Sequence, residues 1–288
     1  MFTASSSTPR KAITGARACS RISRSIDKLR PRITPCLLVH DGGLVKTVGF
    51  KEPKYVGDPI NAVKIFNEKE ADELIVLDID ATVNNAEPDF KLIARLAAEC
   101  RMPLCYGGGV RTVEQAKKII GLGVEKVALS AAALEDPTLI TRIAEEIGSQ
   151  SVVVVLDVKK RLLGKDHDVW THNGRKNTKK AVLDVALDAQ ARGAGEIVVN
   201  SIENDGRMKG YDLALAARLR QALKVPMTVL GGAGSLADIG KLIEACGVVG
   251  AAAGSLFVFK GTYKAVLINY PNPAQKDDII RAALRPVA

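Results

Sequence analysis

The stretch SVVVVLDVKK, residues 151–160, indicates which fold to expect, because it has an earlier counterpart in TPCLLVHDGG, residues 34–43. Each stretch is a short apolar run that leads into polar residues, the pattern of a strand buried on both faces and followed by a turn. Asp157 closes the apolar run of the later stretch, and Leu38 holds the matching position in the earlier one. One half of the chain therefore ends a strand with a carboxylate where the other half has a leucine.

Apolar runs of this kind recur along the chain and alternate with segments of helical periodicity. Asp58 and Asp136 are each followed by proline, which predicts a helix N-cap and a first helical residue. Residues 87–100 and 112–123 carry the i, i+3, i+4 apolar spacing of a helix with one buried face. Eight such strand–helix units predict a (β/α)8 barrel rather than a doubly wound sheet. The eight expected strands are residues 33–39, 74–79, 103–108, 126–130, 152–157, 196–201, 226–232 and 248–253.

An internal repeat supports the closed barrel. The glycine pair at 107–108 recurs at 231–232 with an offset of 124, and Glu73 recurs as Glu196 with an offset of 123. The second half thus repeats the first strand for strand, which predicts two half-barrels of four units each. The two strand ends quoted above are then equivalent positions in the two halves.

The positive charge of the chain is concentrated at its start. The net charge is +9, but residues 1–32 hold eight Lys or Arg and one acid, so +7 lies there and +2 is left for the rest. A nearly neutral body with 4% aromatic residues argues against a nucleic-acid partner. We expect residues 1–31 to be a basic N-terminal extension that is disordered, a transit peptide or a leader upstream of the true start, and residues 32–288 to form a single barrel domain.

Other features of the composition exclude several classes of protein. The longest apolar runs are shorter than the roughly 18 residues of a membrane span, so no membrane association is expected. The five cysteines are an odd number without CxxC spacing, which favours free thiols and a cytoplasmic protein. The three histidines lack metal-ligand spacing, so no metal site is expected.

Two glycine-rich turns stand at matching places in the repeat, CYGGGV after the third expected strand and LGGAGS after the seventh. In a (β/α)8 barrel such turns lie at the C-terminal ends of the strands, where active sites are found. Glycine lets backbone N–H groups approach a phosphate closely, and the following helix N-terminus adds favourable partial charge. The pair predicts a ligand with two phosphate groups, although tight turns alone also require glycine.

Asp157 is the main acid–base candidate on this rim, because the apolar strand before it fixes the carboxylate in place. A rigid carboxylate beside a substrate suits a general acid or base. The alternative is a structural anchor for the polar segment 158–178, which we expect to form a lid or a hairpin over the site. Further ionisable residues expected on the rim are Asp41, Lys46, Asp78, Asp80, Lys159 and Asp205.

A second charged set falls at the opposite, N-terminal ends of the strands. Two acids and two bases there would meet around the barrel mouth as alternating ion pairs. One interpretation is a plug of salt bridges that closes the barrel, and the other is a polar gate to a path through it. The members of the set are Arg32, Glu73, Lys126 and Glu196.

From about residue 32 to about residue 259 the chain resembles HisF, the cyclase subunit of imidazole glycerol phosphate synthase. The resemblance implies a duplicated (β/α)8 barrel that receives ammonia from a glutaminase docked on its N-terminal face, and it implies no cofactor. Ammonia would pass through the barrel to a small-molecule substrate held by two phosphates. The motifs that carry the resemblance are GDP at 57–59, the GGG turn, DPTLITRIAEEIGSQSVVVVLDVK, RKNT, RGAGEIVVNSIENDG, GYD, GGAGS and AAAGSLF.

The resemblance also assigns roles to individual positions. It implies that Asp157 is the second catalytic aspartate and that the four charged residues at the strand beginnings form the ammonia gate. The implied substrate- and phosphate-binding positions are Lys46, Asp78, Gly107, Gly108, Gly109, Ser130, Asp205, Gly231, Gly232, Gly234, Gly254 and Ser255.

The first catalytic aspartate of the resembled family is replaced here by Leu38. A leucine cannot transfer a proton, and loss of one such group commonly lowers a rate by about 10² to 10⁴. Ammonia delivery is therefore expected to persist while histidine-pathway chemistry suffers. Departures on the same face are His40 for a lysine, Ser130 for an asparagine, Ala131 for a threonine and Leu230 for a serine.

The chain further resembles HisF-like proteins associated with glycosyl amidation, through the segment 33–80 and the ending AAAGSLFVFKGTYKAVLINYP. That resemblance implies a glutaminase and a sugar amidotransferase as partners, and an acetamidino sugar of a surface polysaccharide such as lipopolysaccharide as product. Two alternatives stay open. One is an authentic cyclase of histidine biosynthesis that uses Asp157 with a substitute such as Asp41, and the other is a non-catalytic barrel that docks and activates a glutaminase.

Overall fold

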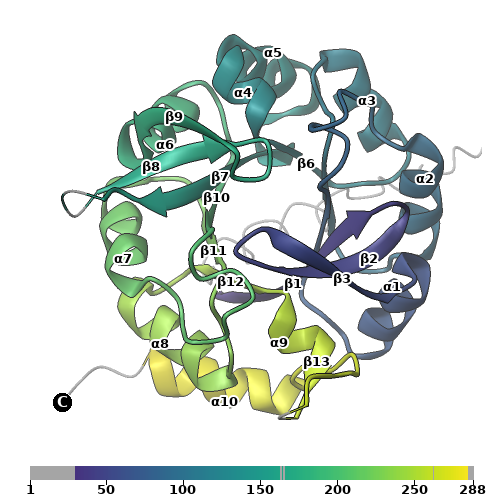
Figure 1. The fold of residues 1–288 in the computed structure, drawn as a ribbon, viewed down its shortest axis with the longest axis vertical. Coiled ribbons are helices and arrows are strands. Elements are labelled where there is room, and N and C mark those ends of the chain that lie inside the picture. The colour runs from purple at the N-terminus through teal and green to yellow at the C-terminus, as the bar shows by residue number, and fades with distance from the viewer. Residues whose placement is uncertain (1–29, 163, 165, 262, 285–288) are drawn as a thin grey trace, which may run out of the picture. The chain divides into compact units, whose positions relative to one another are not determined.

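Eight parallel strands close into a barrel in the structure, a computed structural model that describes residues 30–162, 164, 166–261 and 263–284 (Figure 1). The first strand pairs with both the last strand and the second, which closes the ring. The predicted (β/α)8 barrel and its eight predicted strands are therefore confirmed. The prediction for residues 1–31 lies outside the described residues except at its last two positions. The barrel strands are β1 (Arg32–His40), β4 (Leu74–Asp78), β5 (Leu104–Gly107), β6 (Lys126–Leu129), β7 (Val152–Lys160), β10 (Glu196–Ser201), β11 (Met227–Leu230) and β12 (Gly250–Ala253).

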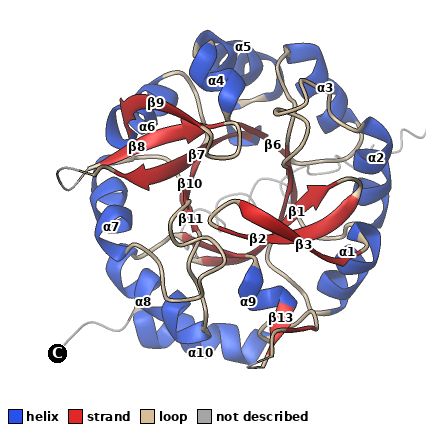
Figure 2. Cartoon of the chain, in the orientation of Figure 1, coloured by secondary structure: helices blue, strands red, loops and turns tan. Residues whose placement is uncertain are grey.

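Helices surround the barrel as an outer ring (Figure 2). Within the described residues, none of these helices is long and apolar enough to cross a membrane. A short hairpin of β13 (Phe259–Lys260) and β14 (Ala265–Val266) follows the last barrel unit. The helices are α1 (Pro59–Glu68), α2 (Phe90–Glu99), α3 (Val113–Gly121), α4 (Ala131–Glu135), α5 (Thr138–Ile147), α6 (Val182–Ala191), α7 (Leu213–Ala222), α8 (Leu236–Cys246), α9 (Ser255–Val258) and α10 (Pro273–Ala283).

The predicted helix starts agree with the structure at one position and differ by one residue at the other. Asp58 Oδ1 accepts a hydrogen bond of 2.8 Å from the backbone N–H of Asn61, and Pro59 is the first residue of α1, as predicted. At the second site α5 begins at Thr138, one residue later than predicted. The reason is that Asp136 is the C-cap of α4, where its backbone N–H donates to the carbonyl of Ala132. Helix α5 therefore cannot begin directly after Asp136.

Two hairpins rise from equivalent strands of the two half-barrels. β1 continues into β2 (Gly43–Val48) and β3 (Lys51–Gly57), and β7 continues into β8 (His167–Thr171) and β9 (Lys176–Ala181). Both hairpins lie at the same end of the barrel, over the C-terminal ends of the strands (Figure 1). The prediction of a hairpin within residues 158–178 is confirmed, and the first half carries a matching one.

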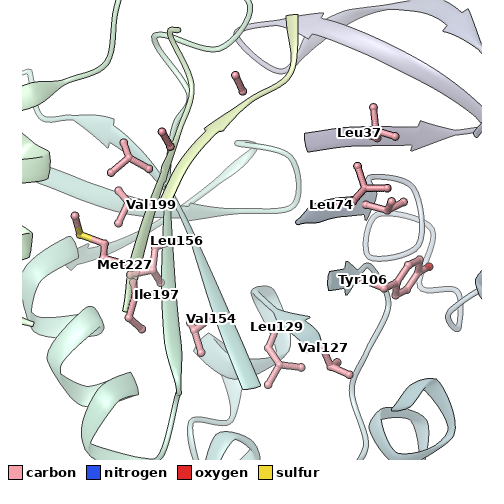
Figure 3. Packing of buried hydrophobic residues seen from close by; sticks show 14 of the residues in the cluster. Leu37, Leu74, Tyr106, Val127, Leu129, Val154, Leu156, Ile197, Val199 and Met227 are labelled. Atoms are coloured by element: carbon pink, nitrogen blue, oxygen red, sulfur yellow. The ribbon is translucent and has the colours of Figure 1, made fainter. Parts of the chain in front are cut away.

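The apolar residues form two separate layers of core. Val154 and Leu156 of β7 face outward and pack with the helices, as Figure 3 shows for these and neighbouring residues. Val153 and Val155, the alternate positions of the same strand, face the inside of the barrel. A strand that is buried on both faces has no polar face, which is why residues 152–156 are continuously apolar.

Replacing the α1 cap by Asp58→Ala is expected to lower the free energy of unfolding by about 1 kcal/mol, because the Asn61 amide loses its partner. Denaturant unfolding measures this change. The matched control is Glu68→Ala at the exposed end of the same helix, expected to stay within about 0.5 kcal/mol. Equal effects of the two substitutions would contradict the capping role.

Candidate active site

A cavity of about 220 Å³ opens at the C-terminal ends of the barrel strands. It gathers side chains and turns from both half-barrels, and all but one of the rim positions that the resemblance implied contribute to it. The predicted residues that line the cavity are Leu38, Lys46, Asp78, Gly107, Gly108, Gly109, Ser130, Asp157, Asp205, Gly231, Gly232, Gly254 and Ser255.

Gly234 is the implied phosphate-binding position that does not line this cavity, and the predicted rim residues Asp41, Asp80 and Lys159 do not line it either. Its backbone N–H donates to Asp238 Oδ2 at 3.0 Å, and a side chain in its place would meet the carbonyl oxygen of Met208 at 2.2 Å. This glycine therefore serves the start of α8 and a close approach of two backbones. The motif LGGAGS contains both the glycine-rich turn that lines the cavity and the start of α8. The sequence pattern does not show which of its glycines belongs to which feature.

The two glycine-rich turns lie on opposite sides of the cavity, each before a capped helix. Gly108 has a φ of +128° and Gly232 a φ of +114°, in the left-handed region that favours glycine. The following helices, α3 and α8, begin with complete capping boxes at Thr112 and Ser235, and they stand across the barrel from each other (Figure 1). The two turns thus face one cavity from opposite sides, which suits a ligand with an anionic group at each end.

Asp157 extends from the end of β7 into the cavity, and its carboxylate Oδ1 accepts a hydrogen bond of 2.9 Å from Asn200 Nδ2. Burial raises the pKa of Asp157 to about 7, the hydrogen bond from Asn200 opposes this rise, and the charge of Asp205 adds to it. A carboxyl group that titrates near neutral pH can both accept and donate a proton. Asn200 was missed from the sequence, although its place two residues after Val198 puts it on the inner face of β10.

Leu38 makes the opposite side of the cavity apolar. Its side chain is partly buried and packs, with Leu77, against the residues inside the barrel. Leu230 from β11 and Val155 from β7 line the same floor. Leu38, the counterpart of Asp157 in the first half-barrel, can therefore make apolar contacts with a ligand but cannot donate a proton to it.

Asp205 holds the β2–β3 hairpin over the cavity. Its Oδ2 accepts hydrogen bonds from Thr47 Oγ1 at 2.7 Å and from the backbone N–H of Phe50 at 3.1 Å, while its carbonyl accepts from Gly49 at 3.1 Å. Burial raises the pKa of Asp205, and the hydrogen bonds from Thr47 and Phe50 act against this rise. Asp205 is thus a positioning group for the hairpin that carries Lys46.

Asp78 is engaged in the turn after β4, where its Oδ1 accepts from the backbone N–H groups of Asp80 and Ala81 at 2.9 and 3.1 Å. Nearby, His40 Nδ1 lies 2.7 Å from Asp80 Oδ1 and His40 Nε2 lies 3.5 Å from Asp41 Oδ2. Among the described residues, His40, Asp41 and Asp80 form the one set with metal-ligand spacing. Both ring nitrogens of His40, however, already face carboxylates. The three residues are best described as an ion-pair cluster that joins the β1 and β4 ends.

The four charged residues at the opposite end of the barrel form the predicted ring of alternating ion pairs. Arg32 contacts Glu73 Oε2 and Glu196 Oε1 at 2.6 Å each, and Lys126 Nζ contacts Glu196 Oε2 at 2.8 Å and also pairs with Glu73. Thr228 was not predicted, and its hydroxyl donates to Glu196 at 2.6 Å.

The ring is asymmetric in exposure. The side chains of Glu73 and Glu196 are 5% and 6% exposed, whereas those of Arg32 and Lys126 are 29% and 18% exposed. Burial alone would raise the pKa of Glu196, but the charges and hydrogen bonds of Arg32 and Lys126 outweigh it and hold the pKa at about 2. The carboxylate of Glu196 thus remains charged inside the ring, while the two bases are its more exposed members.

The fold and this arrangement agree with comparisons to known proteins. Residues 32–264 match the family of histidine biosynthesis proteins. The chain is 40% identical to imidazole glycerol phosphate synthase subunit HisF of Streptococcus sanguinis over 229 residues, which cover 80% of this chain and 90% of that protein. The chain therefore belongs to the HisF family.

Relatives with numbered or provisional names are more similar. A Vibrio vulnificus protein provisionally named imidazole glycerol phosphate synthase subunit HisF3 is 61% identical over 86% of this chain and 95% of its own length. A Pseudomonas aeruginosa protein provisionally named subunit HisF2 is 54% identical over 86% of this chain and 99% of its own length.

The raised pKa of Asp157 predicts a specific pH dependence of stability. Between about pH 4 and pH 7 the folded carboxyl holds a proton that the unfolded one has lost, so the free energy of unfolding should fall as pH rises, by up to about 1.4 kcal/mol per pH unit. Asp157→Asn should lack this contribution. Urea unfolding of both proteins from pH 4.5 to pH 7.5 measures the difference, and parallel pH curves would refute the assignment.

Glu196→Gln is expected to destabilise the protein by about 3 kcal/mol, because Arg32 and Lys126 keep their charges while one buried counter-charge is lost. The exposed substitution Glu145→Gln on α5 is the control, expected to change stability by less than about 0.5 kcal/mol. Denaturant unfolding at pH 7 compares them. A Glu196→Gln effect as small as that of the control would mean that the ring is solvated.

Proposed function

We propose that the chain is the ammonia-accepting synthase subunit of a cytoplasmic two-protein enzyme. A glutaminase of the HisH type docks on the N-terminal face of the barrel and releases ammonia there. The ammonia passes the ring of Arg32, Glu73, Lys126 and Glu196, crosses the barrel, and reacts in the cavity at the other end. The observation that carries the proposal is the presence of a charged ring and a ligand-sized cavity at opposite ends of one barrel.

The inside of the barrel supports passage of a small neutral molecule. Nine of the described buried residues line it from the ring to the floor of the cavity, and four of them, Cys36, Cys105, Ala128 and Ala252, have small side chains. An apolar lining favours neutral ammonia over the ammonium ion, since a buried charge without a partner is costly. The hydroxyl of Thr34, fully buried on the same face of β1, has no hydrogen-bond partner within the described part of the chain and is suited to a passing ammonia.

The substrate that we propose is a phosphorylated compound or a nucleotide sugar. The glycine-rich turns before α3 and α8 line opposite sides of the cavity with backbone that a phosphate can approach closely. Gly254 and Ser255, at the end of β12, add a third turn on the same rim. A ligand with anionic groups at both ends would bring its centre to Asp157.

The reaction that we propose is amidination of a sugar, for an acetamidino sugar of a surface polysaccharide such as lipopolysaccharide, together with a sugar amidotransferase. Leu38 supports this choice, because the cavity keeps Asp157 and its turns but lacks a second carboxylate at the equivalent strand end. Histidine-pathway cyclisation to imidazole glycerol phosphate is the second candidate, and the relatives named HisF favour it. A non-catalytic barrel that activates a glutaminase is less well supported, because a conduit does not need two phosphate-type turns.

A cyclase assay separates the candidates. The purified chain would be given ammonium salt at alkaline pH and the phosphoribulosyl formimino-carboxamide nucleotide, with Leu38→Asp run alongside. We expect turnover of Leu38→Asp to exceed that of the unmodified chain by about 10² or more, because the substitution restores a group that transfers protons. Turnover of the unmodified chain at the rate of a HisF cyclase would instead establish the histidine reaction.

The partner is tested separately with a HisH-type glutaminase. Addition of the chain should increase glutamine hydrolysis, and the ring variant Glu196→Gln should uncouple hydrolysis from ammonia use in the cavity. The control is Glu145→Gln. If the chain leaves glutamine hydrolysis unchanged, the proposed partnership is wrong.

A further inference from the structure

Lys46 is a buried amine that has no acidic partner in the part of the chain that the structure describes. The residue is 5% exposed, and its Nζ donates a hydrogen bond of 2.6 Å to the backbone carbonyl of Cys36. Among the described residues, no carboxylate oxygen lies within 4.0 Å of this nitrogen. Asp205 is the acid whose charge acts on it, and its Oδ2 already accepts hydrogen bonds from Thr47 and Phe50. A buried lysine in such surroundings is costly as an ammonium ion.

The niche that holds this amine depends on the missing side chain of Gly254. Gly254 has a φ of −105°, which any residue adopts, so its backbone does not require glycine. A Cβ at this position would lie 2.5 Å from Lys46 Nζ, 3.3 Å from Lys46 Cε and 3.2 Å from the carbonyl oxygen of Cys36. Pairing between β1 and β12 stops one residue earlier, at Pro35 and Ala253, and the amine fills the place where the ladder ends.

The surroundings of the amine favour its neutral form. Burial lowers the pKa of Lys46, and the charges of Cys36 and Asp205 act in the opposite direction without being in contact. The thiol of Cys36 is itself held protonated, because burial raises its pKa to about 12. Asp157 is the remaining acid near Cys36, and burial raises its pKa to about 7. A lysine desolvated in this way is a nucleophile.

We propose that Lys46 is a nucleophilic amine that condenses with the carbonyl group of a phosphorylated aldehyde or ketone bound in the cavity. The lone pair of Nζ attacks the carbonyl carbon, and the carbonyl oxygen takes a proton to give a carbinolamine. The hydroxyl group of the carbinolamine then leaves as water together with the second of the two protons that the neutral Nζ brought, and the neutral imine remains. The net change is amine plus carbonyl to imine plus water, with no oxidation or reduction.

This chemistry uses the ammonia delivery of the proposed function and rests on it to that extent, but its electrophile is an aldehyde or ketone instead of the amide-level carbonyl of an amidination. Ammonia attacks the imine carbon, the Lys46 amine leaves, and the substrate departs with a C=NH group in place of its C=O group. Lys46 returns to its starting form, and the proton balance is zero. Lys46 thus provides a group that activates an electrophile on the side of the cavity where Leu38 provides none.

The experiment traps the imine and needs no knowledge of the natural substrate. The full chain at pH 7 is incubated with glyceraldehyde 3-phosphate and sodium cyanoborohydride, which reduces an imine to a stable amine. The modified lysines are then located and quantified by peptide mass spectrometry. We expect Lys46 to be modified faster than Lys51 and Lys54, which are exposed on the same hairpin, because burial lowers the pKa of Lys46 and leaves more of its amine neutral at pH 7.

One control tests the niche of the amine, and the others test the ligand class. Gly254→Ala should slow Lys46 modification about tenfold or more and leave Lys51 unchanged, and its melting temperature verifies folding. Unphosphorylated glyceraldehyde should modify Lys46 more slowly than the phosphate ester does, and inorganic phosphate should compete with the ester. Equal rates for the two aldehydes would overturn the phosphorylated ligand class and leave the nucleophile in place.

Modification of Lys46 at or below the rate of Lys51 in the unmodified chain would overturn the proposal, whatever the variants do. The result does not depend on whether a glutaminase binds, so its failure is distinct from failure of the ammonia pathway.

Discussion

Closure of the parallel sheet is the constraint on which the rest of the structure depends. Because β1 pairs with β12 on one side and β4 on the other, every barrel strand has an inner face and an outer face. Along β1 the inner face passes from Arg32 at the charged ring, through Thr34 and Cys36, to Leu38 at the cavity. Each strand thereby contributes to both ends of the molecule, and a shift of one residue in its register would exchange the two faces.

This constraint explains why the fold could be predicted from the sequence. A strand that is covered on both faces must be apolar throughout, so the eight strands appear as eight apolar runs, and the repeat of glycines and charges fixes their correspondence. The site could be located for the same reason. Parallel strands in a barrel all end at one rim, so Asp157, the glycine turns and Lys46 were expected together before any contact was known.

The contacts within the site could not be predicted, because they join residues that are distant in sequence. Asn200 binds Asp157 from 43 positions away, and Thr47 binds Asp205 from 158 positions away. Sequence periodicity places each of these side chains on a face but does not say which atoms meet. Gly234 shows the opposite case, in which a motif predicted a site residue that does not line the cavity. Its backbone N–H instead bonds Asp238, and its missing side chain allows close approach of the Met208 backbone.

The paired hairpins have a consequence for how such a barrel changes over time. Each half-barrel carries its own hairpin on its own first strand, β2–β3 after β1 and β8–β9 after β7. A duplicated protein of this design can therefore alter the reactive groups of one half while the other half preserves them. Leu38 and Asp157, the equivalent strand ends of the two halves, differ in this respect, while a glycine-rich turn is present in each half. The reactive groups and the ligand-holding turns of such a barrel can thus change independently.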